Sequence, residues 1–389
     1  MNETQFYTLL GSLVFGGSDT LWKTFSAEER EELCRLARQR KLGTLFYRRL
    51  YKELPEPYAQ EFGKLYRAAA ARAMLELAER KRLFDLLAKE RIRFAPIKGL
   101  DLAFRLYPDS TLRPHVDWDI LFHPDDIQRA RLLLEANGWK PYGQYRDSNP
   151  GEHHFEPLYR HGLALEPHWT LPNVSNLTPR QLWENLKKDE SGIYLLPPEW
   201  NLLLLIAHAT SIDFRHVPPW KLLPDAGFLL QKETADWGKV RELATRHDVF
   251  SPDLFLGAWM EFFPAGMLPP EAEDPEAAAL IHALGGAAHR LTKDPYEQLM
   301  NKPEKISVSW FKKRLNIYLH PHRMLRKYGI RKNSIPLFLW CVIKDFCGKT
   351  AAFFHFLFRK DPGSRSYYTL LDDLHALDCK RKSVRGGKA

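Results

Sequence analysis

Short apolar runs of the kind that form β-strands are confined to one part of this chain, residues 92–169. The clearest is the run 115–122, HVDWDILF, in which polar and apolar residues alternate before an apolar end. The run 92–99, IRFAPIKG, is strand-like and ends in a glycine. Helical periodicity dominates on both sides of this segment. The chain is therefore predicted to form one small sheet with helices before and after it.

The first 90 residues have the pattern of helices. Ser26 and Glu29 have the spacing of a capping box, in which each side chain satisfies a backbone N–H at the helix start. A long helix rich in Ala and Leu is predicted over 59–89. The whole is an α+β fold, a small mixed β-sheet core flanked by helical regions. Its predicted regions are a helical N-terminal region (1–90), the core (91–195), a helical domain (196–300) and a basic, aromatic, helical C-terminal region (301–389).

Within the predicted core, local sequence patterns predict one helix and two more strands. The run 123–139 predicts a helix that begins at Asp125 or Asp126 and ends at Asn137-Gly138. Two short strands are predicted around the turn 160–162, Arg-His-Gly.

Charge is distributed unevenly along the chain. Its net charge is +9, but residues 301–389 hold 20 Lys and Arg against 6 Asp and Glu, whereas the preceding 300 residues are net acidic. A basic segment of this kind predicts a nucleic acid, an anionic membrane surface or an acidic protein as its partner.

Asp117 and Asp119 are two residues apart on the predicted strand 115–122. Side chains at i and i+2 project from one face of a strand, so the two carboxylates would repel each other unless a cation lay between them. Mg²⁺ (or Mn²⁺) is the expected cation, because it takes oxygen ligands and leaves positions open for phosphate. The alternative is a solvated pair at a strand end.

Glu166 lies on a second predicted strand between apolar residues, in LALEPHW. Two acids on one strand and a third on another are typical of metal-dependent phosphoryl or nucleotidyl transfer, so Asp117, Asp119 and Glu166 are the predicted catalytic and metal-binding residues. Glu166 as a surface acid at a strand edge is the competing interpretation.

Three residues close to this strand can bind a triphosphate. Gly99 lets the backbone approach a phosphate closely, Lys98 supplies charge, and Arg113 can bind phosphate with two N–H groups. Charged side chains solvated near a turn would give the same pattern.

The residues in IKGLDLAFRLYP, LRPHVDWDILF and LALEPHWTL resemble the uncharacterised bacterial nucleotidyltransferase family of the DNA polymerase β-like superfamily. The resemblance covers about residues 5–250. It implies transfer of a nucleoside monophosphate from an NTP to a hydroxyl-bearing acceptor, which can be a small molecule, a peptide or a macromolecule. It also places His168, His208 and Asp225 at recurrent family positions, possible residues of the acceptor side. Packing and hydrogen bonding between helices is the alternative role for His208 and Asp225.

One position departs from the superfamily pattern. Its usual Gly-Ser turn reads Gly99-Leu100 here, without the hydroxyl that would contact phosphate. A catalytically degenerate protein that acts as a nucleic-acid- or partner-binding module is therefore an alternative function.

Two further alternatives come from other parts of the sequence. A metal hydrolase would need ligands from the six histidines in or beside the core, His115, His123, His153, His154, His161 and His168. The basic, aromatic run 310–333 has the composition of a nucleic-acid-binding segment.

The sequence predicts a cytoplasmic protein. Its four cysteines form no CxxC pair, and the N-terminus lacks the basic and apolar regions of a signal peptide. The stretch 335–358 is the most apolar, but its central charges disfavour a bilayer crossing. It is expected to form a buried helix, or one that lies peripherally on a membrane surface.

Overall fold

The computed structural model describes residues 3–16, 20–141, 153–214, 219–290 and 362–386, and the single residues Pro336, Leu339, Trp340 and Ile343. The chain divides into two compact units, one of Met1–His282 with Leu374–Ala389 and the other of Ala283–Asp373. All candidate site residues belong to the first unit. The basic run 310–333 lies outside the described residues, as does the stretch 335–358 except for those single residues. The boundaries at residues 90, 195 and 300 stay predictions.

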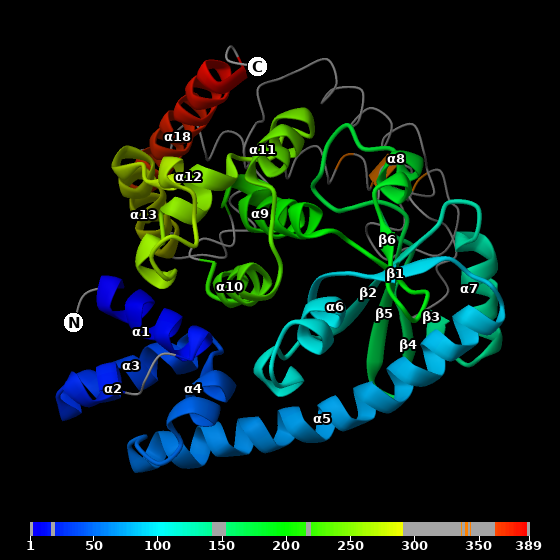
Figure 1. The fold of residues 1–389 in the computed structure, drawn as a ribbon, viewed down its shortest axis with the longest axis horizontal. Helices are drawn as coiled ribbons and strands as arrows, with labels where there is room; N and C mark the ends of the chain where they lie inside the picture. Colours follow the sequence, from blue (N-terminus) through cyan, green and yellow to red (C-terminus); the bar gives the residue numbers. More distant parts are fainter. Residues whose placement is uncertain are drawn as a thin grey trace. The chain divides into compact units, whose positions relative to one another are not determined.

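Helices form the N-terminal part of the first unit, as predicted. They are α1 (Glu3–Phe15), α2 (Thr20–Thr24), α3 (Ala27–Gln39), α4 (Gly43–Leu50) and α5 (Glu56–Lys89). The capping box of α3 is present, with Ser26 and Glu29 each satisfying the other's backbone N–H. The long helix α5 runs past both the preceding helices and the sheet (Figure 1). Its Phe62 ring packs edge-on against Phe46 of α4, and its Leu83 enters the core beneath the sheet.

The sheet has five strands in the order β1-β2-β5-β4-β3. The strands are β1 (Phe94–Pro96), β2 (Asp117–Phe122), β3 (Lys140–Pro141), β4 (Leu158–Arg160) and β5 (Leu163–His168). Among the described strands, only β2 and β5 pair in parallel, and the other neighbours are antiparallel. The expected mixed sheet and the α+β class are therefore confirmed. A second, two-stranded sheet joins β6 (Lys187–Lys188) to β7 (Tyr194–Leu195).

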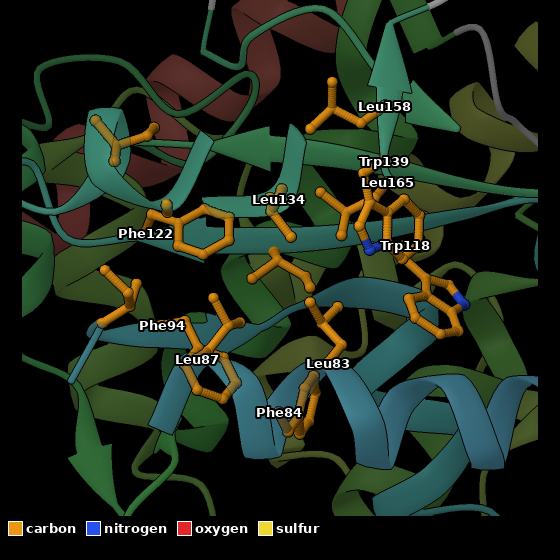
Figure 2. Close-up of a cluster of buried hydrophobic side chains, with 14 of the residues drawn as sticks. Leu83, Phe84, Leu87, Phe94, Trp118, Phe122, Leu134, Trp139, Leu158 and Leu165 are labelled. Atoms are coloured by element: carbon orange, nitrogen blue, oxygen red, sulfur yellow. The ribbon is translucent and has the colours of Figure 1, made fainter. Parts of the chain in front are cut away.

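The two faces of the sheet differ in chemistry because side chains alternate along each strand. Trp118, Ile120 and Phe122 of β2 and Leu165 of β5 lie in one buried apolar cluster with Leu83, Phe84 and Leu87 of α5 (Figure 2). The alternate residues of both strands, Asp117 and Asp119 of β2 and Glu166 and His168 of β5, project from the opposite face. Burial of the apolar face fixes which residues the other face presents, since a slip by one residue would exchange the two sets.

The connections near the sheet follow the sequence signals. The helix after β2 is α7 (Ile127–Ala136), and it ends at Asn137 and Gly138, the latter with φ +87°. The turn between β4 and β5 has positive φ at both His161 and Gly162, as a tight hairpin requires. Val116, just before β2 begins, is 78% exposed and lies outside the core.

The rest of the described chain is mainly helical, as expected for 196–300. Its α-helices are α6 (Lys98–Arg105), between β1 and β2, and α8 (Pro179–Glu184), α9 (Pro198–Phe214), α10 (Leu222–Lys232), α11 (Trp237–Arg246), α12 (Pro252–Gly257), α13 (Pro275–Arg290) and α18 (Pro362–Gly386). Short 3-10 turns are η1 (Ser110–Leu112), η2 (Met260–Phe262) and η3 (Pro270–Ala272). Among the described residues, no helix has both the length and the apolar character to cross a membrane.

Candidate metal centre

Asp119, Glu166 and His168 meet because β2 and β5 run in parallel. In the register of the two strands Asp119 lies opposite Glu166, and Leu121 lies opposite His168. His168 follows Glu166 by two residues, so both project from the face that carries Asp119. Asp119 and His168 are 49 positions apart in sequence. Strand pairing, and not a local turn, therefore brings them together.

The three side chains of this group lie close to one another. His168 Nε2 is 2.9 Å from Asp119 Oδ1 and 3.5 Å from Glu166 Oε2. One donor atom from each of the three residues lies within 4.8 Å of the others, and Asp119 and His168 are buried. Two carboxylates and an imidazole are all competent metal ligands, so the residues present fit a divalent ion.

The electrostatics of the two aspartates differ although both lie on one face. Burial alone would raise the pKa of Asp119, but hydrogen bonding from His168 and the charge of Lys98 hold that pKa well below its usual range. Burial raises the pKa of Asp117, and the negative charges of Asp119 and Glu166 raise it further. The hydrogen bond from His168 lowers the pKa of Glu166. Asp117 thus senses the charges of the group without being one of its three convergent donors.

Lys98, the first residue of α6, approaches Asp119. Its Nζ lies 2.7 Å from Asp119 Oδ1, the same oxygen that faces His168. The backbone N–H of Ile97 donates to the carbonyl of Asp119 at 3.0 Å, which fixes the turn against β2. Lys98 has φ +50°, a conformation that costs free energy for a residue with a side chain. The fold therefore holds the backbone of Lys98 in a strained conformation, with its ammonium group at the carboxylate of Asp119.

Position 99 requires a glycine because His115 lies very close to its backbone. A Cβ atom at this position would lie 2.9 Å from His115 Cβ and 3.8 Å from Arg113 Nη1. His115 cannot move aside easily, because it is nearly buried and its Nε2 lies 3.6 Å from the buried carboxylate of Glu76. The glycine thus sets the distance between the start of α6 and the segment that leads into β2.

Arg113 binds a partner that the sequence did not predict. Its Nε and Nη2 donate to the two carboxylate oxygens of Asp225 on α10, at 2.7 and 2.9 Å. Tyr107 Oη donates to Asp225 Oδ1 at 2.7 Å, and the Asp225 side chain is fully buried. Burial would lower the pKa of Arg113, but Asp225 raises it above its usual range. Two of the three guanidinium nitrogens are thereby occupied, and Nη1 contacts the carbonyl of Pro114.

The remaining candidate residues are histidines. His208 lies on α9 and is half-buried, and its role at the acceptor side stays a prediction. Of the six histidines considered as metal ligands, three come together: the rings of His153, His154 and His168 have centroids 4.6 to 5.3 Å apart. Only His168 belongs to the convergent donor group found among the described residues.

His168 as a donor beside the two carboxylates was not predicted from the sequence, which placed it on the acceptor side. The available signal was its spacing. In Glu166-Pro167-His168 the acid and the imidazole are at i and i+2, which puts both on one face of a strand. Only the partner strand shows that this face also carries Asp119.

Comparison with known proteins identifies one family. A family model described as uncharacterised nucleotidyltransferase matches residues 26–260, which contain every residue of the candidate centre. Neither a curated protein nor a solved structure gives a significant match.

Proposed function

The chain belongs to the family of uncharacterised nucleotidyltransferases, and on this premise we propose that it transfers a nucleoside monophosphate from an NTP to a hydroxyl-bearing acceptor. The observation that carries the proposal is the convergence of Asp119, Glu166 and His168 on one sheet face, with Lys98 directed at the same point. A divalent ion held there would neutralise the phosphates and polarise the reacting oxygen atoms.

The reaction forms one bond and breaks one. The acceptor oxygen bonds to the α-phosphorus, the bond from that phosphorus to the bridging oxygen breaks, and pyrophosphate leaves with the electron pair. The hydroxyl proton passes to a carboxylate of the centre or to water. In this proposal Asp117, Asp119 and Glu166 supply the carboxylates. Asp117 is proposed as a further ligand because it shares the face of Asp119, although it is not one of the three convergent donors.

The triphosphate is assigned to the turn that begins α6. Lys98 supplies the positive charge and Gly99 leaves the backbone without a side chain beside it. The N-terminal N–H groups of α6 add to the attraction for an anion. Arg113 contributes its charge, and Asp225 fixes the guanidinium in place through Nε and Nη2, while Nη1 donates to the carbonyl of Pro114.

The proposal is tested by titration calorimetry of ATP, GTP, CTP and UTP in the presence of Mg²⁺ or Mn²⁺. Wild type is compared with the Asp117→Ala/Asp119→Ala double variant and with Glu184→Gln, an exposed acid on α8 that serves as a matched control. Metal-dependent binding of a nucleotide by wild type and by the control, absent from a folded double variant, is the expected result. Failure of folded wild type to bind any NTP would overturn the proposal.

A second candidate is a degenerate family member that binds a partner without catalysis. It is favoured by Leu100, which stands where a phosphate-binding serine is expected and is fully buried in the sheet core. The same titration separates the two functions, since a degenerate protein would bind no NTP in a metal-dependent manner. The basic C-terminal segment would then be tested for salt-dependent binding to nucleic acid or anionic vesicles.

A further inference from the structure

The candidate centre contains an imidazole where a magnesium site would need only oxygen. His168 Nε2 faces both carboxylates, 2.9 Å from Asp119 Oδ1 and 3.5 Å from Glu166 Oε2. Mg²⁺ binds oxygen ligands and retains several waters, whereas imidazole is a preferred ligand of the transition metals. The identity of the donors therefore bears on the identity of the ion.

The spacing of the donors supports direct coordination by His168. Two ligand atoms at about 2.1 Å from one ion lie about 3.0 Å apart at a right angle and about 3.4 Å apart at a tetrahedral angle. The two distances from His168 Nε2, 2.9 and 3.5 Å, match those separations. Without an ion, the 2.9 Å contact is a hydrogen bond between Nε2 and Asp119, and a bound cation would take the place of its proton.

The position of the ring is fixed by the fold. His168 is fully buried, lies on β5 within the sheet register, and stacks on His153 with ring planes 26° apart. A donor held in this way is organised before the ion arrives, so little ordering free energy opposes binding.

We propose that His168 is a metal ligand together with Asp119 and Glu166, and that this centre binds a first-row transition-metal ion in preference to Mg²⁺. The inference rests on the proposed function, since it names the ion of that same site. It can nevertheless be tested without a nucleotide.

The test uses Mn²⁺ alone and full-length protein. Pulsed EPR of bound Mn²⁺ detects nitrogen that is directly coordinated, and the signal changes when the protein is labelled with nitrogen-15 histidine. We expect nitrogen coupling in wild type that responds to the label. This measurement needs no variant and so does not depend on the folding of one.

Two substitutions assign the coupling to a residue. His168→Gln is expected to abolish it and to lower the affinity for Mn²⁺ by at least the roughly 10- to 100-fold that the loss of a partner behind a metal ligand costs, while the weaker affinity for Mg²⁺ changes little. His154→Gln is the matched control, because it removes the neighbouring imidazole, whose ring centroid is 5.1 Å from that of His168. The coupling and the affinity for Mn²⁺ are expected to persist in it.

Three outcomes would overturn the inference. They are no binding of Mn²⁺ by wild type, binding without nitrogen coupling, and coupling that survives His168→Gln. None of them depends on NTP binding. A protein that shows the histidine coupling but binds no NTP would retain this metal centre and lose the proposed nucleotidyl transfer.

Discussion

The ammonium group of Lys98 lies 2.7 Å from Oδ1 of Asp119, so the cation from the strand-to-helix turn pairs with the carboxylate of the candidate metal centre. A metal ion at Asp119 must share or displace this partner. Once displaced, Lys98 can interact with the phosphates of the nucleotide. The ion pair therefore links the binding of metal to the binding of NTP.

Lys98→Met is expected to change the two affinities in opposite directions. Without nucleotide, the affinity for Mn²⁺ should rise about tenfold, equivalent to about 1.4 kcal/mol, because no ammonium group competes for Asp119. The affinity for NTP with metal should fall because a phosphate contact is lost. Calorimetry measures both, with Lys81→Met on the exposed side of α5 as the control. A parallel fall in both affinities would contradict the competition.

Asp225→Asn is expected to destabilise the fold strongly. It leaves the guanidinium of Arg113, whose side chain is 13% exposed, without its charged partner. Breaking a buried pair from one side costs about 3–5 kcal/mol of unfolding free energy. Urea denaturation compares it with Asp85→Asn, which removes a pair exposed to solvent and should cost no more than about 0.5 kcal/mol. Equal losses in the two variants would show that Asp225 does not anchor Arg113.

Gly99→Ala is expected to cost about 1–3 kcal/mol, because the new Cβ overlaps with His115 Cβ. In the Gly99→Ala background, His115→Gly should recover part of that loss. His115→Ala should not, since it retains the Cβ atom that causes the clash. Thermal unfolding of the single and double variants provides the measurement, and equal recovery by both second substitutions would refute this contact.

The lowered pKa of Asp126, which is not a residue of the metal centre, predicts that the free energy of unfolding depends on pH. Burial opposes ionisation of Asp126, but its carboxylate accepts from Nε and the backbone N–H of Arg93 at 2.6 and 3.1 Å, and its pKa is lowered. A lowered pKa in the folded state adds stability above the ordinary value of the group, and this stability is lost as the pH falls through the lowered pKa.

The unfolding free energy of wild type should therefore exceed that of Asp126→Asn by a constant amount above about pH 5 and by a shrinking amount below about pH 4. Denaturant titrations from pH 7 to pH 3 measure this difference. A difference that stayed constant over the whole range would contradict the role of the Arg93 pair.

The sequence by itself determined the local features. Alternation over 115–122 predicted the strand β2 and placed Asp117 and Asp119 on one face, because side chains repeat every two residues along a strand. The capping box at Ser26 and the hairpin turn at Gly162 were also predictable, since each depends on residues only a few positions apart.

The tertiary structure alone decided which distant residues meet. Asp119 lies opposite Glu166 because the apolar residues just before them, Trp118 and Leu165, are buried together and fix the parallel register. Arg113 binds Asp225 across 112 positions, a partner that the sequence did not predict. No local pattern encodes such pairs. Their geometry follows from the packing of the whole core, which also brings the imidazole of His168 beside two carboxylates.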